Sequence, residues 1–200
     1  MTLGPVHIVD DDEATRDALV WLMQSRNVAA EEYASAEDFL AAWEPGKIGC
    51  LLLDLRMEGM SGLELFDRLR ELGNRLPVIF LTGHGDISIA VSSLKQGAYD
   101  FVEKPFNNND LVDRVIAAIN LEAEQRSRED VRSTLAARLA KLSAREREVM
   151  DFILAGKLNK QIAEELGVSM RTVEVHRANL FSKMEVRSAV ELAQILSLSN

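Results

Sequence analysis

Disulfides, membrane-length apolar segments and a surplus of basic residues are all missing from this chain. Cys50 is the only cysteine, so no disulfide can form within the chain, and its place in an apolar segment predicts a buried thiol. No segment approaches the ~18 consecutive apolar residues of a membrane helix. The first residues also lack a basic stretch followed by an apolar one. We therefore expect a soluble, cytoplasmic protein with no membrane partner.

Charge is divided unevenly along the chain. Residues 1–120 hold 20 Asp and Glu against 10 Lys and Arg, whereas residues 121–200 hold 12 against 13. The first part therefore has a net charge of -10 and the second a net charge of +1. An acidic first part repels nucleic acid, so any nucleic-acid contact should come from a local positive patch in the second part.

Short apolar runs alternate with amphipathic segments over the first 120 residues, which is typical of a parallel α/β sheet. We expect five strands, at residues 6–10, 28–33, 49–54, 77–82 and 99–103. Helices are expected between them at residues 14–25, 36–42, 62–72 and 87–96, and a last helix from about Asn109 onward. Trp21 and Trp43 lie within helical apolar patterns, so we expect both to be packing residues.

An apolar stripe with three- and four-residue spacing runs through the charged segment 121–141 and just beyond it. The stripe consists of Val131, Leu135, Leu139 and Leu142. It predicts a helical linker, which is either a solvated connector or a helix that pairs with the same segment of a second chain. After it the pattern is helical only, with four helices expected at 143–155, 159–166, 169–184 and 188–197. The expected parts are thus 1–120, the linker 121–141, and an all-α domain at 142–200.

Acidic residues close two of the expected strands. Asp10, Asp11 and Asp12 follow the apolar segment 6–9, and Asp54 follows the apolar segment 50–53. Because the carboxyl ends of neighbouring parallel strands converge on one crevice, these carboxylates should lie a few ångströms apart. At an effective dielectric near 20, two unit charges about 4 Å apart repel by roughly 4 kcal/mol, so the cluster needs a cation. Mg2+ is the natural candidate, since it leaves open positions for phosphate oxygens.

Three side chains at strand ends indicate phosphoryl chemistry at this cluster. Asp54 could attack phosphorus and form an acyl phosphate. Lys104 could supply positive charge to the phosphoryl oxygens, and Thr82 could donate a hydrogen bond to one. Taken singly, Asp11 or Asp12 could cap a helix, Thr82 could belong to a turn and Lys104 could be solvated. Their joint occurrence at the ends of strands one, three, four and five favours the functional interpretation.

The motifs of this first part resemble those of response-regulator receiver domains. They read Val9-Asp10-Asp11-Asp12-Glu13, Asp54-Leu55-Arg56-Met57, Leu81-Thr82-Gly83-His84-Gly85 and Lys104-Pro105-Phe106. The resemblance implies a doubly wound, flavodoxin-like sheet, with Asp54 as the phosphoacceptor and Lys104 paired with the phosphoryl group. It implies that Mg2+ is held by Asp10, Asp11, Asp54 and the main-chain carbonyl of Arg56. It also implies a switch formed by Thr82 and Phe101, and a cis Lys104–Pro105 bond.

One position departs from the receiver pattern. The family usually has Met-Pro after the phosphorylated strand, whereas this chain has Met57-Glu58. Without proline the loop should be more mobile, and Glu58 adds negative charge near the metal, so we expect an altered phosphoryl lifetime. His84, which lies between two glycines, is expected to be an exposed turn residue and not a general acid.

Residues 159–184 have the form of a helix-turn-helix, with Gly167 suited to a left-handed turn position. At 100° per residue, the apolar face of the second helix is opposite a face of small and polar side chains, which can enter the DNA major groove. Base contacts are expected from Arg171, Glu174, Val175 and Ala178, and phosphate contacts from Lys160, Thr172, Asn179 and Lys183, with His176 packing and reaching a phosphate. Arg177 lies nearer the core face. A helix pair used for protein docking is the alternative.

The second part resembles the LuxR-type helix-turn-helix. The motifs are Leu142-Ser143-Ala144-Arg145-Glu146-Arg147-Glu148-Val149, Asn159-Lys160-Gln161-Ile162-Ala163 and Thr172-Val173-Glu174-Val175-His176-Arg177. Receiver plus this domain is the NarL/FixJ arrangement, and both halves are most similar to FixJ-like regulators. This implies a transcription factor that a sensor histidine kinase phosphorylates, and that then dimerises, binds double-stranded promoter DNA and engages RNA polymerase.

Two other functions fit parts of the pattern. A Mg2+-dependent phosphohydrolase could use Asp54 as nucleophile, but such enzymes commonly place an aspartate two residues further on, where this chain has Arg56. Fast turnover of a small phosphate ester would indicate that function. A regulator that is active without phosphate is the other alternative, and gel shifts with and without a phosphodonor separate it from a phosphate-dependent one.

Overall fold

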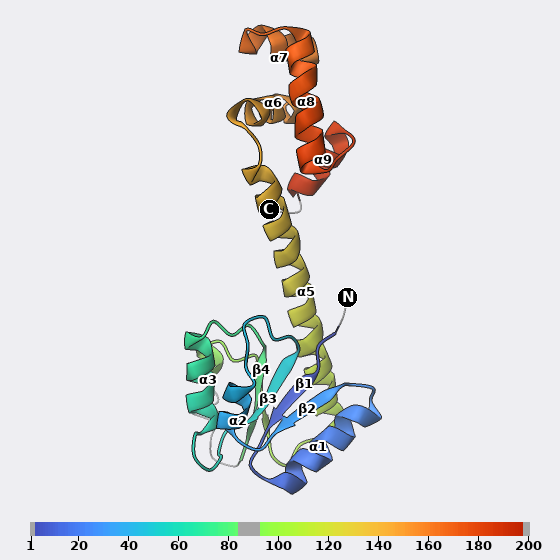
Figure 1. Cartoon of the computed structure of the whole chain (residues 1–200). Coiled ribbons are helices and arrows are strands. Elements are labelled where there is room, and N and C mark those ends of the chain that lie inside the picture. Colours follow the sequence, from blue (N-terminus) through green and yellow to red (C-terminus); the bar gives the residue numbers. More distant parts are fainter. Residues whose placement is uncertain (1–2, 84–92, 198–200) are drawn as a thin grey trace. The chain divides into compact units, whose positions relative to one another are not determined.

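The computed structural model describes residues 3–83 and 93–197, and the chain forms two compact units that divide between Arg126 and Ser127 (Figure 1). The first unit is an α/β sheet domain and the second is helical. None of the helices in these described ranges is both long enough and apolar enough to cross a membrane.

Five parallel strands form the sheet of the first unit. They are β1 (Val6–Val9), β2 (Ala30–Tyr33), β3 (Cys50–Asp54), β4 (Val78–Thr82) and β5 (Asp100–Glu103). The strand order is β2-β1-β3-β4-β5, and every neighbouring pair is parallel. The predicted doubly wound sheet is confirmed, and the expected strands match within one or two residues at each end. As expected, Cys50 is a buried free thiol.

Helices cover both faces of this sheet (Figure 1). Residues of α1 (Glu13–Ser25) and of the first part of α5 (Asn108–Ala140) share a buried cluster with one face of the strands. Residues of α2 (Ala36–Ala41) and α3 (Gly62–Glu71) share a second cluster with the other face. The central strands are therefore buried on both sides, which explains why their sequences are continuously apolar and do not alternate.

The strands that follow β1 in the chain, β2 and β3, lie on opposite sides of it in the sheet. The chain leaves β1 for β2 on one side and returns to β3 on the other, so the carboxyl ends of β1 and β3 flank a crevice that the connecting loops leave open. The register pairs Val9 with Leu53, which places the residues that follow β1 beside the last residue of β3, Asp54. Topology thus brings together acidic residues that are more than 40 positions apart in the sequence.

Two of the sequence predictions in this unit fall partly or wholly outside the described residues. The expected helix 87–96 is described only at its end, where residues 93–95 are helical and Gly97 follows with a left-handed φ of 103°. His84 lies outside the described residues.

The two tryptophans differ from one another. Trp43 is partly buried and packs against the second buried cluster, as predicted. The prediction for Trp21 is wrong, because its side chain is 72% exposed on α1. The helical pattern placed Trp21 beside apolar neighbours, but the buried face of α1 is formed by Leu19, Leu22 and Met23.

Within its described residues, 127–197, the second unit consists of five helical segments. The last part of α5 is followed by α6 (Ala144–Leu154), α7 (Asn159–Leu166), α8 (Met170–Met184) and α9 (Ala189–Ser197). Ser143 and Ser169 cap α6 and α8 by accepting a hydrogen bond from a main-chain N–H of the first turn. The four helices expected after the linker are thus confirmed. Three of them begin one residue later than predicted, because the prediction had counted the preceding serine as part of the helix.

The apolar stripe of the linker has a different role from both predicted ones. Residues 121–140 continue α5 without a break, and Leu135 and Leu142 are buried in the core of the second unit with Leu139 packed against it. Arg138 fastens the same segment, because its guanidinium donates to the main-chain carbonyl of Met184 at 3.1 Å. These leucines are therefore neither a solvated connector nor free to pair with a second chain, and of the stripe only Val131 is exposed.

Candidate functional site

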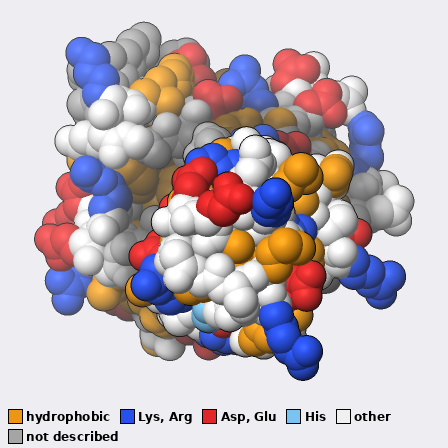
Figure 2. All heavy atoms as spheres, turned by 90° about the horizontal axis from the view of Figure 1, so that it is seen from above, with side chains coloured by type: hydrophobic (Ala, Val, Ile, Leu, Met, Phe, Trp, Pro, Cys, Tyr) orange, Lys and Arg blue, Asp and Glu red, His pale blue; other side chains and the backbone are white. Residues whose placement is uncertain are grey.

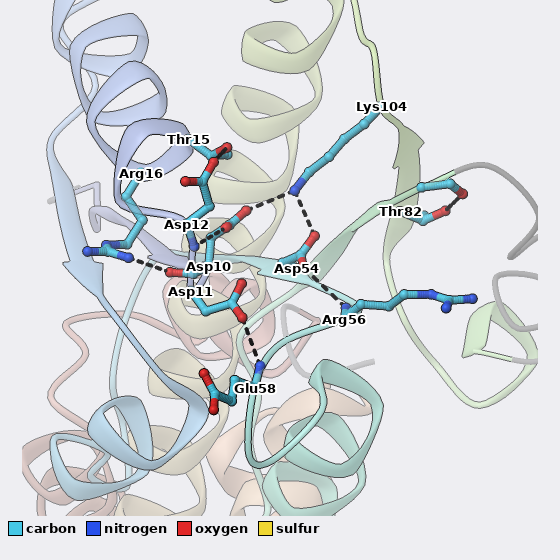
Figure 3. A network of polar contacts seen from close by, with 11 residues as sticks. Asp10, Asp11, Asp12, Thr15, Arg16, Asp54, Arg56, Glu58, Thr82 and Lys104 are labelled. Atoms are coloured by element: carbon cyan, nitrogen blue, oxygen red, sulfur yellow. Dashed lines mark hydrogen bonds and ion pairs between the residues drawn. The ribbon is translucent and has the colours of Figure 1, made fainter.

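Three carboxylates meet where β1 and β3 end (Figure 3). Asp10 and Asp11 follow β1, Asp54 closes β3, and one oxygen of each lies within 4.8 Å of one from each of the others. Asp10 and Asp54 are buried, whereas Asp11 is exposed. The predicted convergence of these three side chains is therefore observed. Asp12 points elsewhere and accepts a hydrogen bond from the hydroxyl of Thr15.

Lys104 supplies positive charge to this cluster. Its ammonium donates to Asp54 Oδ1 at 2.7 Å and to Asp10 Oδ2 at 2.9 Å. Burial disfavours the charged ammonium, but the hydrogen bonds to Asp54 and Asp10 outweigh it, so the pKa of Lys104 is raised. Burial also raises the pKa of Asp54, although Lys104 acts in the opposite direction. Burial thus makes the ionised form of Asp54 unfavourable in free energy, and a further cation beside it would offset that cost.

Main-chain N–H groups orient each carboxylate. The N–H of Arg56 donates to Asp54 Oδ2 at 3.2 Å, and that of Asp12 donates to Asp10 Oδ1 at 3.0 Å. The N–H of Glu58 donates to Asp11 Oδ2 at 2.8 Å. Oxygen donors of this kind, one of them exposed, are the set that Mg2+ prefers when it keeps several waters. The cluster therefore fits Mg2+ in ligand type and in spacing.

The residues of the predicted switch lie on the next two strands, with Thr82 at the end of β4 and Phe101 within β5. The buried hydroxyl of Thr82 donates to the main-chain carbonyl of Gly83 at 3.0 Å, and Figure 3 shows it turned away from Asp54. Phe101 is partly buried and packs against the cluster of hydrophobic residues under α2 and α3. The Lys104–Pro105 bond is cis, as the resemblance implied.

The second unit presents a helix-turn-helix formed by α7 and α8. Gly167 ends α7 with a left-handed φ of 64°, which confirms its predicted turn position. Val173, Leu180 and Met184 are the buried face of α8. On the face that Figure 2 shows, basic and acidic side chains are interspersed.

Most residues expected to contact DNA lie on the open side of this motif. Lys160, Arg171, Glu174, Val175, Ala178 and Asn179 are exposed, whereas Thr172, His176 and Lys183 are partly buried. Lys183 donates to the buried carboxylate of Glu146 at 2.6 Å, which makes it a contact between α6 and α8 as well. The guanidinium of Arg177 lies 5.3 Å from the ring centre of Phe181, in agreement with its predicted place near the core face.

Sequence reasoning missed two residues that support these sites. Arg16 donates to the main-chain carbonyl of Asp10 at 2.8 Å, and nothing in its helical position signals that contact. Glu146 is buried and accepts hydrogen bonds from Lys183 and from the N–H of Ser143. The spacing Ser143-x-x-Glu146 is the signature of a capping box and could have indicated its role.

Each of the two units matches a known protein family. Residues 6–116 match the family described as "Response regulator receiver domain", and residues 140–196 match "Bacterial regulatory proteins, luxR family". The chain is 52% identical over 192 residues to the C4-dicarboxylate transport transcriptional regulatory protein DctR of Rhodobacter capsulatus, covering 95% of this chain and 98% of that protein. It is 45% identical to the transcriptional regulatory protein FixJ of Azorhizobium caulinodans, covering 98% and 92%.

Solved structures show the same likeness. The response regulator StyR is 38% identical with a TM-score of 0.88, covering 98% of this chain and 99% of that one. Full-length FixJ from B. japonicum is 39% identical with a TM-score of 0.63, covering 100% of this chain and 98% of that one. The agreement extends over both units of the chain.

Proposed function

The chain belongs to the response regulators of the NarL/FixJ type, with a receiver domain and a LuxR-type DNA-binding domain, and we propose that phosphorylation of Asp54 controls its binding to promoter DNA. The phosphodonor is a histidine of a sensor kinase. The named relatives are regulators of transcription, which points away from an enzymatic role. We place this function in the cytoplasm, where promoter DNA lies.

The observation that carries this proposal is the position of Lys104. Its ammonium bridges Asp10 and Asp54, so a cation already lies where the negative oxygens of a phosphoryl group would arrive. A carboxylate at the end of a strand, with an ammonium at 2.7 Å and two further carboxylates beside it, suits phosphoryl transfer better than it suits a purely structural role.

The transfer forms one bond and breaks one. An Asp54 Oδ attacks phosphorus, the P–N bond to the donor histidine breaks, and its electron pair stays on the imidazole nitrogen. Asp10, Asp11, Asp54 and the carbonyl of Arg56 would hold Mg2+, which would supply positive charge to the phosphoryl oxygens. Lys104 then exchanges its Asp54 contact for a phosphoryl oxygen.

Phosphorylation changes the acceptors available to Thr82. Its hydroxyl now donates to the carbonyl of Gly83, and a phosphoryl oxygen is a stronger, charged acceptor. Thr82 would turn toward Asp54, and Phe101 would turn into the space that it leaves. We propose that this rearrangement favours a homodimer, in which two DNA-binding domains on one duplex gain avidity.

The DNA-binding domain would read sequence through α8. Arg171, Glu174, Val175 and Ala178 would face base edges, and Lys160, Thr172, Asn179, His176 and Lys183 would lie near phosphates. Lys183 is the weakest member of this set, because its ammonium is paired with Glu146. RNA polymerase is the expected partner at the promoter.

The test is intact-protein mass spectrometry after incubation with Mg2+ and a small phosphodonor, followed by gel shifts. The unsubstituted chain should gain one phosphoryl group and bind DNA more tightly. Asp54→Asn should do neither, and the neighbouring control Asp12→Asn should behave as the unsubstituted chain. A phosphoryl group found on Asp54→Asn, or an equal gain in DNA affinity for that variant, contradicts the proposal.

A further inference from the structure

The loop between β3 and α3 is attached to the acidic cluster through the main chain of Glu58. Its N–H donates to Asp11 Oδ2 at 2.8 Å, a contact between residues 47 positions apart. The main chain of Glu58 and not its side chain makes this contact. The Glu58 carboxylate points away from Asp54 (Figure 3). The contact requires a residue with an N–H, which proline lacks.

The same loop is held on the far side of Glu58. The N–H of Met60 donates to Glu37 Oε1 at 3.1 Å, and Gly59 has a left-handed φ of 78°. Ser61 and Glu64 then form a capping box at the start of α3. Glu58 is therefore presented to Asp11 by a loop with fixed points on both sides. The greater mobility of this loop and the altered phosphoryl lifetime both stay predictions.

Asp11 is the member of the acidic cluster that most needs such support. Asp10 and Asp54 are buried and each contacts Lys104, whereas Asp11 is exposed. Among the described residues, Glu58 provides the hydrogen bond that reaches Asp11 from outside its own loop. One Asp11 oxygen accepts this bond, and the other is left to act as a ligand.

We propose that the main-chain N–H of Glu58 positions the Asp11 carboxylate for Mg2+. The same hydrogen bond keeps this carboxylate at a fixed place relative to the loop that carries the Arg56 carbonyl. Glu58 is thus a positioning residue that acts through its backbone. Groups that orient a metal ligand change metal affinity about 10- to 100-fold when they are removed. The inference rests on the proposed Mg2+ site. It gives a physical reason for a residue other than proline at position 58, because only such a residue has an N–H to donate to Asp11.

The test uses the full chain, titrated with Mg2+ alone by calorimetry, and three substitutions of one residue. Glu58→Ala removes the side-chain charge and keeps the N–H, Glu58→Gly keeps the N–H and loosens the loop, and Glu58→Pro removes the N–H. We expect Glu58→Pro to weaken Mg2+ binding about tenfold relative to Glu58→Ala. Glu58→Ala and Glu58→Gly should stay within about threefold of the unsubstituted chain.

Each other result overturns the inference. Equal affinities of the proline and alanine variants mean that the N–H is not used. Equal weakening by proline and glycine means that a disturbed loop conformation, and not the loss of the N–H, is the cause. If Glu58→Pro does not fold, amide hydrogen exchange of the unsubstituted chain and of Asp11→Ala tests the contact instead. Protection of the Glu58 amide that is lost in Asp11→Ala supports the contact, and an unprotected amide contradicts it. Absence of any Mg2+ binding by the unsubstituted chain would instead contradict the proposed function.

Discussion

The buried carboxylate of Glu146 on α6 accepts a hydrogen bond of 2.6 Å from the ammonium of Lys183 on α8. The same carboxylate oxygen accepts from the N–H of Ser143, so one side chain caps α6 and connects it to α8, the second helix of the helix-turn-helix. The hydrogen bond from Lys183, together with those from Ser143, outweighs the effect of burial and lowers the pKa of Glu146. Lys183 therefore has a structural role whether or not it also reaches a phosphate.

Replacing Lys183 by methionine should destabilise the DNA-binding domain at neutral pH. The aliphatic stem is kept, but Glu146 loses its charged partner, which costs about 1 kcal/mol. Since the pKa of Glu146 is lowered in the folded chain, this contribution is complete above its ordinary pKa and is lost as the pH falls through the folded value. Thermal unfolding followed by circular dichroism at pH 7 and below about pH 4 measures it. An equal effect at both pH values would contradict the assignment.

Asp54→Asn should stabilise the receiver domain when Mg2+ is absent. The pKa of Asp54 is raised, so its ionised form opposes folding at neutral pH, and asparagine removes that charge. The gain should be complete above the folded pKa and should shrink as the pH falls through it toward the unfolded value of about 3.9. Tryptophan fluorescence during thermal unfolding reports on it, since Trp21 and Trp43 both lie in this unit. Asp17→Asn, on the exposed side of α1, is the control and should change little.

Leu135→Ala should destabilise the second unit by about 2–4 kcal/mol, because Leu135 is buried in its core and alanine leaves a cavity. Val131→Ala, one turn earlier and exposed, should change stability by less than about 0.5 kcal/mol. The loss should be visible by circular dichroism but not by tryptophan fluorescence. If the two substitutions instead changed self-association equally and left stability intact, the stripe would belong to an interface between chains.

Base recognition and phosphate contact should respond differently to substitution. Glu174→Gln should reduce discrimination at one base pair by about 1–3 kcal/mol, because the carboxylate is exposed on the open face of α8 and can accept from cytosine. Lys160→Ala should weaken binding to all sequences and lower the slope of log affinity against log salt by about 1. Selection of bound fragments and titrations at several salt concentrations measure these effects. A sequence-specific loss for Lys160→Ala would reverse the assignments.

Trp21 should be accessible to an aqueous quencher, whereas Trp43 should be protected. The first is 72% exposed and the second packs against the buried cluster under α2 and α3. Trp21→Ala should change the free energy of unfolding by less than about 0.5 kcal/mol, and Trp43→Ala should lower it by about 2 kcal/mol or more. Acrylamide quenching of the two single-tryptophan variants gives the comparison. Similar quenching in both would contradict the difference in exposure between the two side chains.

Strand ends and helix caps were predictable because they depend on local patterns. Asp54 ends an apolar segment, Gly167 follows an amphipathic one, and Ser143 precedes another, and each lies at the predicted end of its strand or helix. The convergence of Asp10, Asp11 and Asp54 was also predictable, because parallel strands place their carboxyl ends at one edge. By contrast, the apolar pattern around Trp21 indicated a helix but could not tell which side of it would be covered.

By itself the sequence therefore determined the order of strands and helices, the acidic crevice and the helix-turn-helix, since all of these follow from residue spacing and strand direction. Tertiary structure alone decided that Leu135 and Leu142 pack in the second unit, that Lys104 bridges Asp10 and Asp54, and that Lys183 is paired with Glu146. The reason is physical. Periodicity shows which face of an element is apolar or charged, but the partner of that face depends on contacts between residues far apart in the chain.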